Sequence, residues 1–181
     1  MRVIAGIKKG KTLKSPKGKT RPLSDQAKES LFNILRPYTE GSYFLDLFAG
    51  SGGVGIEALS RGATLSIFVE LDKKTVQVIR ENIELCGFTD RSEVYALDVL
   101  RALKILKRKG AKFDIIFIGA PYGSPNLVKA IEELSDGSLL NKEGIVIAEH
   151  RAKHKMEEDF GSLKRVREAR YGDTVLAFYK R

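Results

Sequence analysis

Three glycines in the sequence have the spacing of a nucleoside-binding loop. Gly50, Gly52 and Gly55 in "DLFAGSGGVGIEAL" match G-x-G-x-x-G between an expected strand and an expected helix. Glu70 follows 20 residues after Gly50, at the end of the next expected strand. Glycines let a ligand approach the backbone closely, and a carboxylate at that strand end can accept hydrogen bonds from ribose hydroxyls. The pattern indicates a dinucleotide or S-adenosylmethionine, and a tight turn without a ligand is the alternative.

Two further acids narrow the choice of ligand. Asp46 lies four residues before Gly50, and Asp98 ends the third expected strand in "YALDVL". A carboxylate at position 46 suits the positively charged methionine end of S-adenosylmethionine, but it is unfavourable beside a pyrophosphate. Asp98 can accept a hydrogen bond from an adenine amino group, or it can cap the helix that follows. Acids at three successive strand ends therefore favour an adenosyl ligand without phosphates, a pattern typical of methyltransferases.

These residues need a framework that brings the strand ends together. From residue 43 onward, short apolar runs alternate with amphipathic segments, which is typical of parallel βαβ units. Two C-terminal runs are joined through Gly172 and Asp173, a hairpin signal. We therefore predict an α/β, Rossmann-like fold, with a mainly parallel seven-stranded sheet and an antiparallel C-terminal edge hairpin. The expected strands are residues 43–49, 65–70, 92–98, 113–118, 144–150, 163–172 and 174–181.

Basic residues are concentrated at the N-terminus. Residues 1–21 contain eight of the 32 lysines and arginines and none of the 23 acids. Short apolar pieces separated by Gly6 and Gly10 predict a small β-hairpin, so we expect a basic hairpin arm over residues 1–21 and a second domain over residues 22–181. The charge indicates a polyanionic partner, most simply nucleic acid, and a solvated surface segment is the alternative. The expected contact residues are Arg2, Lys8, Lys9, Lys11, Lys14 and Arg21.

Composition excludes several classes of protein. Cys86 is the only cysteine, which fits a reducing cytoplasm, and two histidines with one cysteine are too few for a typical zinc site. We expect no structural metal, and we expect His150 and His154 to lie on the surface. There is no run of about 18 apolar residues and no apolar signal segment, so neither a membrane span nor secretion is expected. We expect a monomer.

Five segments in order resemble the bacterial 16S rRNA (guanine-N2)-methyltransferases. They are "MRVIAGIKKGKTLKSPKG", "TRPLSDQAKESLFNIL", "FLDLFAGSGGVGIEALSRGA", "VELDKK" and "FDIIFIGAPY". The resemblance implies a class I methyltransferase fold that uses S-adenosylmethionine to methylate N2 of a guanine in small-subunit rRNA, free or in an assembling 30S subunit. It implies that the cofactor is held by Asp46, Phe48, Ala49, Gly50, Ser51, Gly52, Glu70, Leu71, Asp98 and Val99.

The sequence departs from that family after the fourth expected strand. The family carries D-P-P-Y or N-P-P-Y, whereas this chain has Gly119, Ala120, Pro121 and Tyr122. In the family motif, the first side chain and the next backbone carbonyl accept hydrogen bonds from the target amine, and the aromatic ring stacks on the extruded base. Gly119 retains only its carbonyl. Either the carbonyls suffice, or Asp114 or another carboxylate compensates, or transfer is inefficient.

Three other functions remain open from the sequence. A non-catalytic RNA-binding or ribosome-assembly factor with the cofactor fold is consistent with Gly119. A DNA adenine amino-methyltransferase uses the same motif, but 181 residues leave little room for a target-recognition domain. An NAD-dependent oxidoreductase is disfavoured by Asp46 and by the modest length of the chain.

Overall fold

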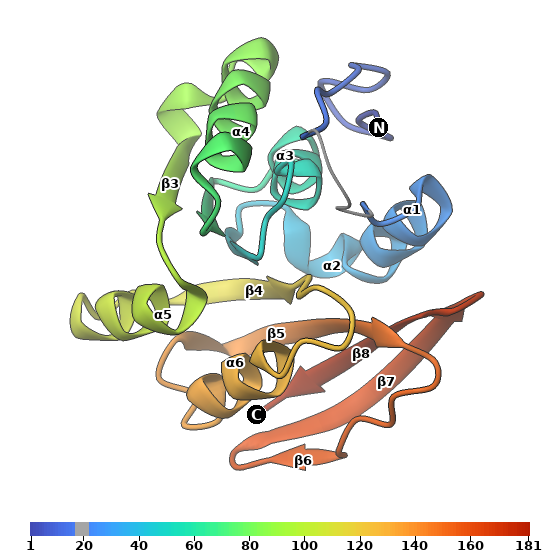
Figure 1. Ribbon diagram of the computed structural model, residues 1–181, viewed down its shortest axis with the longest axis vertical. Coiled ribbons are helices and arrows are strands. Elements are labelled where there is room, and N and C mark those ends of the chain that lie inside the picture. Colours follow the sequence, from blue (N-terminus) through green and yellow to red (C-terminus); the bar gives the residue numbers. More distant parts are fainter. Residues whose placement is uncertain (17–21) are drawn as a thin grey trace.

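The computed structural model describes residues 1–16 and 22–181. Within this part of the chain, eight strands form one sheet with helices on both sides (Figure 1). The strands are Tyr43–Leu47 (β1), Leu65–Glu70 (β2), Ser92–Ala96 (β3), Phe113–Ile118 (β4), Leu140–Arg151 (β5), Asp159–Phe160 (β6), Leu163–Tyr171 (β7) and Thr174–Lys180 (β8). The helices are Asp25–Ile34 (α1), Arg36–Thr39 (α2), Gly53–Ser60 (α3), Lys73–Cys86 (α4), Val99–Arg108 (α5) and Asn126–Leu134 (α6), with a 3-10 turn at Thr89–Arg91.

The strand order is β3-β2-β1-β4-β5-β8-β7-β6. The first five strands in this order are parallel, and β8, β7 and β6 are antiparallel to their neighbours. Chain order reverses between β1 and β4, and open α/β sheets bind ligands in the crevice at the carboxyl ends of strands at such a point. The predicted Rossmann-like α/β fold is confirmed.

Helices cover both faces of the sheet and create two apolar cores. α1, α3 and α4 pack on the face that carries Phe44, Phe68 and Phe117, whereas α5 and α6 pack on the face that carries Leu45 and Ile118. Neighbouring residues of one strand therefore serve opposite cores, which explains why the central strands are apolar almost without interruption. Burying each such side chain contributes about 1.5–3 kcal/mol.

The sheet has eight strands instead of the predicted seven. The extra strand, β6, is only two residues long, and Asp159 and Phe160 pair with Lys164 and Leu163 of β7. So short a pairing leaves no periodic pattern in the sequence. The predicted C-terminal hairpin is present, because Tyr171 pairs with Thr174 across a turn at Gly172 and Asp173.

The predicted N-terminal hairpin is only partly formed. One antiparallel bridge joins Arg2 to Thr12, and Gly6 and Gly10 adopt left-handed conformations with φ of +79° and +83°. Several backbone amides that would form a ladder bond instead to side chains of α3, as described below. Arg21, which was expected to contact nucleic acid, lies outside the described residues.

One expectation about the histidines is wrong. His150 is buried, with 4% of its surface exposed, because β5 continues to Arg151 and β8 pairs alongside it. Its Nδ1 lies 2.9 Å from the carbonyl oxygen of Arg151. His154 lies two residues beyond Ala152, past the end of the strand, and is exposed as expected. Neither ring lines the cavity that is described below.

Two searches of residues 1–16 and 22–181 gave negative results. No helix there is long and apolar enough to cross a membrane. No group of three or more histidine, cysteine, aspartate or glutamate side chains there is arranged to hold a metal ion.

Candidate functional site

The carboxyl ends of four parallel strands place key residues in one row. The register pairs Leu47 of β1 with Val69 of β2 and with Ile118 of β4, and Ile118 with Ala148 of β5. One residue further along each strand, positions 48, 70, 119 and 149 are neighbours. Because side chains alternate between the faces, positions 70, 119 and 149 face the α3 side of the sheet. Phe48 follows the end of β1 with φ of +59° and packs instead against the core on the α5 and α6 side.

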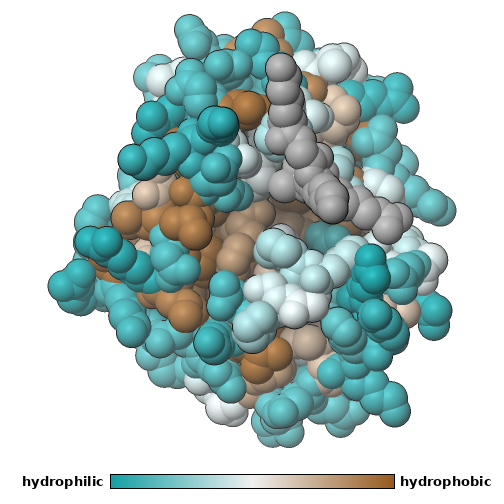
Figure 2. Space-filling model, in the orientation of Figure 1, coloured by the Kyte–Doolittle hydropathy of each residue, from teal (hydrophilic) through white to brown (hydrophobic). Residues whose placement is uncertain are grey.

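A cavity of about 590 Å³ opens at this edge. Figure 2 shows hydrophobic surface near the centre of the viewed face of the molecule, between hydrophilic margins. The cavity joins the two halves of the predicted site, the glycine loop and the turn after β4. Its lining contains six of the ten predicted cofactor residues and all four residues of the turn: Asp46, Phe48, Ala49, Gly50, Ser51, Glu70, Gly119, Ala120, Pro121 and Tyr122.

The four remaining predicted cofactor residues lie outside this lining. Gly52 is the N-cap of α3, with φ of +78°. Asp98 caps α5 by accepting hydrogen bonds from the amides of Leu100 (3.0 Å) and Arg101 (3.2 Å). Leu71 is exposed, and Val99 is buried in the core formed with α5 and α6. The structure shows the capping role of Asp98, and a cofactor role for these four residues stays a prediction.

Asp46 is a buried acid beside the glycine loop. Only 1% of the surface of Asp46 is exposed, and its Oδ2 accepts a hydrogen bond from the amide of Gly55 at 2.9 Å. The pKa of Asp46 is raised to about 8: burial is the main cause, the Gly55 amide opposes it, and the negative charges of Glu70 and Glu149 add to it. Asp46 is therefore mostly protonated at neutral pH, and a cation in the cavity would favour its ionised form.

Glu70 fixes the glycine loop to β2. One carboxylate oxygen accepts a hydrogen bond from the amide of Gly50 at 3.0 Å, and the other accepts from the amides of Leu71 (2.9 Å) and Asp72 (3.0 Å). Gly50 has φ of +55°, which favours glycine, although a Cβ there would meet no atom within 4 Å. The 20-residue spacing therefore has a structural basis before any ligand binds.

Tyr122 is held by the strands beside it. Its hydroxyl donates a hydrogen bond to Oε1 of Glu149 at 2.8 Å and lies 2.9 Å from Oγ1 of Thr174. The guanidinium of Arg151 lies 4.9 Å from the centre of the tyrosine ring. Arg151 therefore covers one face of the tyrosine ring.

The sequence did not predict eleven of the residues that line the cavity, among them Lys28, Phe117, Glu149 and Arg151. Glu149 had a usable signal, because it is a fourth acid near the end of an expected strand. Asp114, which was considered as a compensating carboxylate, lies at the other end of β4. Its oxygens accept hydrogen bonds from the amide of Tyr43 (2.8 Å) and from Nδ2 of Asn141 (2.7 Å), so it does not reach the turn.

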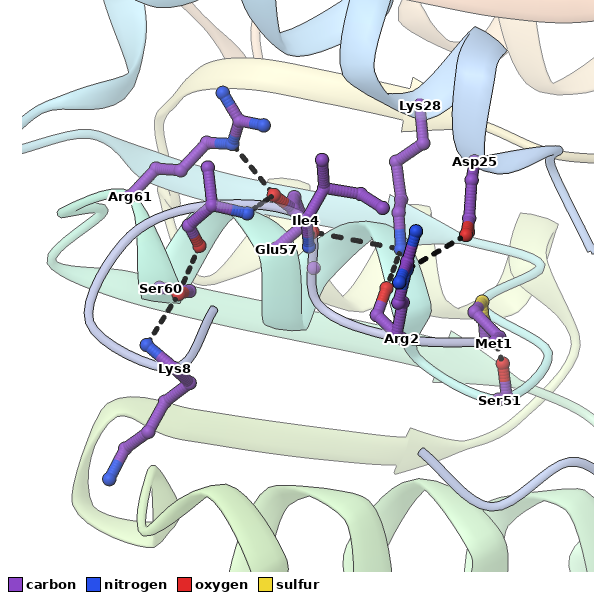
Figure 3. Close-up of polar contacts among 12 residues, drawn as sticks. Met1, Arg2, Ile4, Lys8, Asp25, Lys28, Ser51, Glu57, Ser60 and Arg61 are labelled. Atoms are coloured by element: carbon purple, nitrogen blue, oxygen red, sulfur yellow. Dashed lines mark hydrogen bonds and ion pairs between the residues drawn. The ribbon is translucent and has the colours of Figure 1, made fainter. Parts of the chain in front are cut away.

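The N-terminal arm is attached to α3 beside this cavity (Figure 3). The carboxylate of Glu57 accepts hydrogen bonds from the amides of Ile4 (2.8 Å) and Ala5 (2.9 Å). Oγ of Ser60 accepts from the amide of Lys8 at 3.0 Å and donates to the carbonyl of Ala5 at 2.6 Å. These bonds satisfy amides that a regular hairpin would pair internally.

A buried lysine strengthens this attachment (Figure 3). The side chains of Lys28 and Glu57 are both 0% exposed, and Nζ of Lys28 lies 3.6 Å from Oε2 of Glu57. The same ammonium donates to the carbonyl of Arg2 at 2.6 Å, and Nε of Arg61 lies 2.8 Å from Oε1 of Glu57. Burial lowers the pKa of Lys28, and the Glu57 carboxylate opposes that change.

The expected nucleic-acid contacts differ in their surroundings. Arg2 lies 3.4 Å from Asp25, and Lys14 lies 2.8 Å from Glu81. Lys8 lies over the ring of Phe88, with Nζ 6.0 Å from its centre. Lys9 and Lys11 are exposed, and no acid among the described residues is within ion-pair distance of either. They are the arm cations best placed to meet a polyanion.

The chain is similar to known proteins along almost its whole length. The family model described as "Conserved hypothetical protein 95" matches residues 1–180. The putative rRNA methyltransferase YlbH of Bacillus subtilis is 41% identical over 182 residues, which cover 100% of this chain and 99% of that protein. The ribosomal RNA small subunit methyltransferase D of Haemophilus influenzae is 35% identical over 151 residues, or 82% of this chain and 78% of that protein. The solved structure of the putative methyltransferase YhhF of Escherichia coli has a TM-score of 0.84 at 29% identity and covers 100% of this chain and 97% of that one.

Proposed function

Because the chain belongs to the conserved hypothetical protein 95 family, and its relatives are named as rRNA methyltransferases, we propose that it methylates rRNA. The reaction transfers a methyl group from S-adenosylmethionine to the exocyclic N2 amine of a guanine in 16S rRNA. The substrate is naked rRNA or an assembling 30S subunit in the cytoplasm, and the protein acts as a monomer. The observation that supports this most is one cavity lined by both the glycine loop and the turn at residues 119–122.

The cavity has the chemistry that S-adenosylmethionine requires. Asp46 and Glu70 offer carboxylates to a cationic amino acid moiety and to ribose hydroxyls, and Gly50 leaves the backbone open to close approach. Burial is the main cause of the raised pKa of Asp46, and no cation of the described residues is among its causes, so a cationic ligand would stabilise the ionised carboxylate. When bound, S-adenosylmethionine supplies an electrophilic methyl group on a sulfonium. No arginine or lysine of the described glycine loop is placed to neutralise a pyrophosphate.

The turn after β4 would hold the methyl acceptor. The carbonyls of Gly119 and Ala120 can accept hydrogen bonds from an exocyclic amine, and the ring of Tyr122 can stack on the base. An amine needs no strong general base at the start, because it becomes acidic only as the new bond forms. This explains why neither histidine is needed in the cavity.

A transfer assay tests the proposed function. The protein is incubated with methyl-labelled S-adenosylmethionine and naked 16S rRNA, 30S particles or DNA, and the products are digested to nucleosides. We expect label in N2-methylguanosine from rRNA or 30S particles. Label in methyladenosine from DNA would favour the DNA methyltransferase alternative, and cofactor binding without transfer to any of the three would favour a non-catalytic assembly factor.

The arm cations should contribute to RNA affinity through phosphate contacts. We expect the double variant Lys9→Ala/Lys11→Ala to bind 16S rRNA more weakly and to reduce the slope of log K against log salt by about 1.4–1.8, since each lost contact removes about 0.7–0.9. Filter binding at several salt concentrations measures the slope. The control Lys142→Ala/Lys164→Ala removes the same charge from exposed positions on β5 and β7. Equal slopes for the two double variants would show that the arm is a solvated surface segment.

A further inference from the structure

Gly119 has a neighbour that can replace the side chain it lacks. Ile118 of β4 pairs with Ala148 of β5, so residues 119 and 149 are adjacent on the same face of the sheet. A Cβ built on Gly119 would lie 3.7 Å from Oε2 of Glu149. The glutamate carboxylate therefore reaches, from the next strand, the region that the carboxylate of an aspartate or the carboxamide of an asparagine at position 119 would occupy.

The carboxylate of Glu149 is positioned by other contacts of the site. Oε1 accepts the hydrogen bond from Tyr122 at 2.8 Å, and the Tyr122 hydroxyl also lies 2.9 Å from Oγ1 of Thr174. Glu149 is 8% exposed, so its side chain is enclosed while it still lines the cavity. Oε2 is the Glu149 oxygen that lies 3.7 Å from the position of a Cβ on residue 119.

From this geometry we propose that Glu149 accepts a hydrogen bond from the target amine and so replaces the acceptor side chain that Gly119 lacks. The inference rests on the proposed function. The bond holds one N–H and turns the nitrogen lone pair toward the methyl group. The lone pair forms the C–N bond, the electron pair of the broken S–CH3 bond stays on sulfur, and the proton that nitrogen loses passes to the Glu149 carboxylate and then to water.

The same geometry predicts how the two positions interact. An aspartate at position 119 would bring a second carboxylate close to Glu149, and two like charges in one enclosed site oppose each other. Its Cβ would also lie 3.0 Å from Cε1 of Phe117, which is a tight contact. Gly119→Asp alone should therefore not raise the rate, although the family motif carries an aspartate or asparagine at this position. It should help only when Glu149 has been removed.

Single-turnover methylation of 16S rRNA tests this proposal, with cofactor affinity measured separately by calorimetry. We expect Glu149→Ala to lower the transfer rate about 10²-fold, the size of effect seen when one well-placed polar partner is lost. The affinity for S-adenosylmethionine should change less than about threefold. Glu149→Met, which has a similar length and no oxygen acceptor, replaces the alanine variant if the latter does not fold. The Gly119→Asp/Glu149→Ala double variant should transfer the methyl group at least tenfold faster than Glu149→Ala.

Two controls separate this role from a structural one. Tyr122→Phe removes the hydroxyl that bonds to Glu149 but keeps the carboxylate, so its loss of rate should be smaller than that of Glu149→Ala. Gly119→Ala measures the crowding against Phe117 alone. A transfer rate for Glu149→Ala within threefold of the wild type would overturn the proposal, as would equal losses for Glu149→Ala and Tyr122→Phe without rescue by Gly119→Asp. If the wild-type protein transfers no label to rRNA or 30S particles, the proposed function itself is wrong.

Discussion

Replacing Glu57 by alanine is expected to lower the free energy of unfolding by about 3–5 kcal/mol, because the variant leaves a buried ammonium without its carboxylate. Lys28 is 0% exposed and lies 3.6 Å from Glu57. The amides of Ile4 and Ala5 and the guanidinium of Arg61 lose the same acceptor. Urea unfolding followed by circular dichroism measures the change from the transition midpoint at constant slope.

Two further variants make this prediction specific. Lys28→Met/Glu57→Leu removes both charges and should be more stable than Glu57→Ala, since apolar replacement of a buried ion pair is often close to neutral. Glu81→Ala breaks the exposed pair with Lys14 and should leave the midpoint nearly unchanged. A Glu57→Ala midpoint as high as that of Glu81→Ala would contradict the role assigned to the buried network.

Attachment of the arm through Glu57 also affects the candidate site. Met1 and Lys28 line the cavity, and Oγ of Ser51 lies 3.9 Å from the sulfur of Met1. Substitutions that release the arm would therefore alter the wall of the cavity as well as the positions of Lys9 and Lys11. For this reason, the arm should be tested by substitution of exposed lysines and not by truncation.

Asp46→Asn should move cofactor affinity and stability in opposite directions. Loss of the carboxylate is expected to weaken S-adenosylmethionine binding roughly 30-fold or more, which corresponds to about 2 kcal/mol for a buried charged partner. The variant should nevertheless be more stable than the wild type at pH 8, because the wild type must bury an acid that prefers water. Calorimetry for binding and thermal unfolding for stability measure the two effects.

The raised pKa of Asp46 also predicts the direction in which stability and ligand affinity change with pH. Its pKa is about 8 in the folded protein and 3.8 in its ordinary state, so its contribution to stability is fully present below about pH 4 and is lost as pH rises through 8. The affinity for the ligand changes with pH in the opposite direction. A cation favours the ionised acid, so affinity should rise with pH, by at most about tenfold per unit, and level off above pH 8.

Asp46→Asn should remove both pH dependences between pH 5 and 8. The control Asp72→Asn carries the same substitution at an exposed helix cap, where asparagine also caps well, and it should leave affinity and stability nearly unchanged. If cofactor affinity in the wild type is flat between pH 6 and 8, Asp46 does not meet the cationic part of the ligand.

The order of the elements was predictable from the sequence because each element has a local signature. Alternating apolar runs and amphipathic segments define the βαβ order, and glycines mark positions such as Gly50 and Gly172, where φ is positive. The spacing of Asp46, Gly50 and Glu70 predicted the side of the cavity formed by the glycine loop, since parallel strands end at the same edge. β6 was missed because a two-residue pairing has no such signature.

The acceptor side of the cavity was decided only by the tertiary structure. The sequence shows that Gly119 lacks a carboxylate, but the proximity of Glu149, 30 residues later, depends on the register between β4 and β5. The buried contact of Lys28 with Glu57 likewise depends on how α1 packs against α3, which no local pattern encodes. Local sequence fixes the conformation of each segment, whereas the distance between side chains on different segments is set by the packing of the whole core.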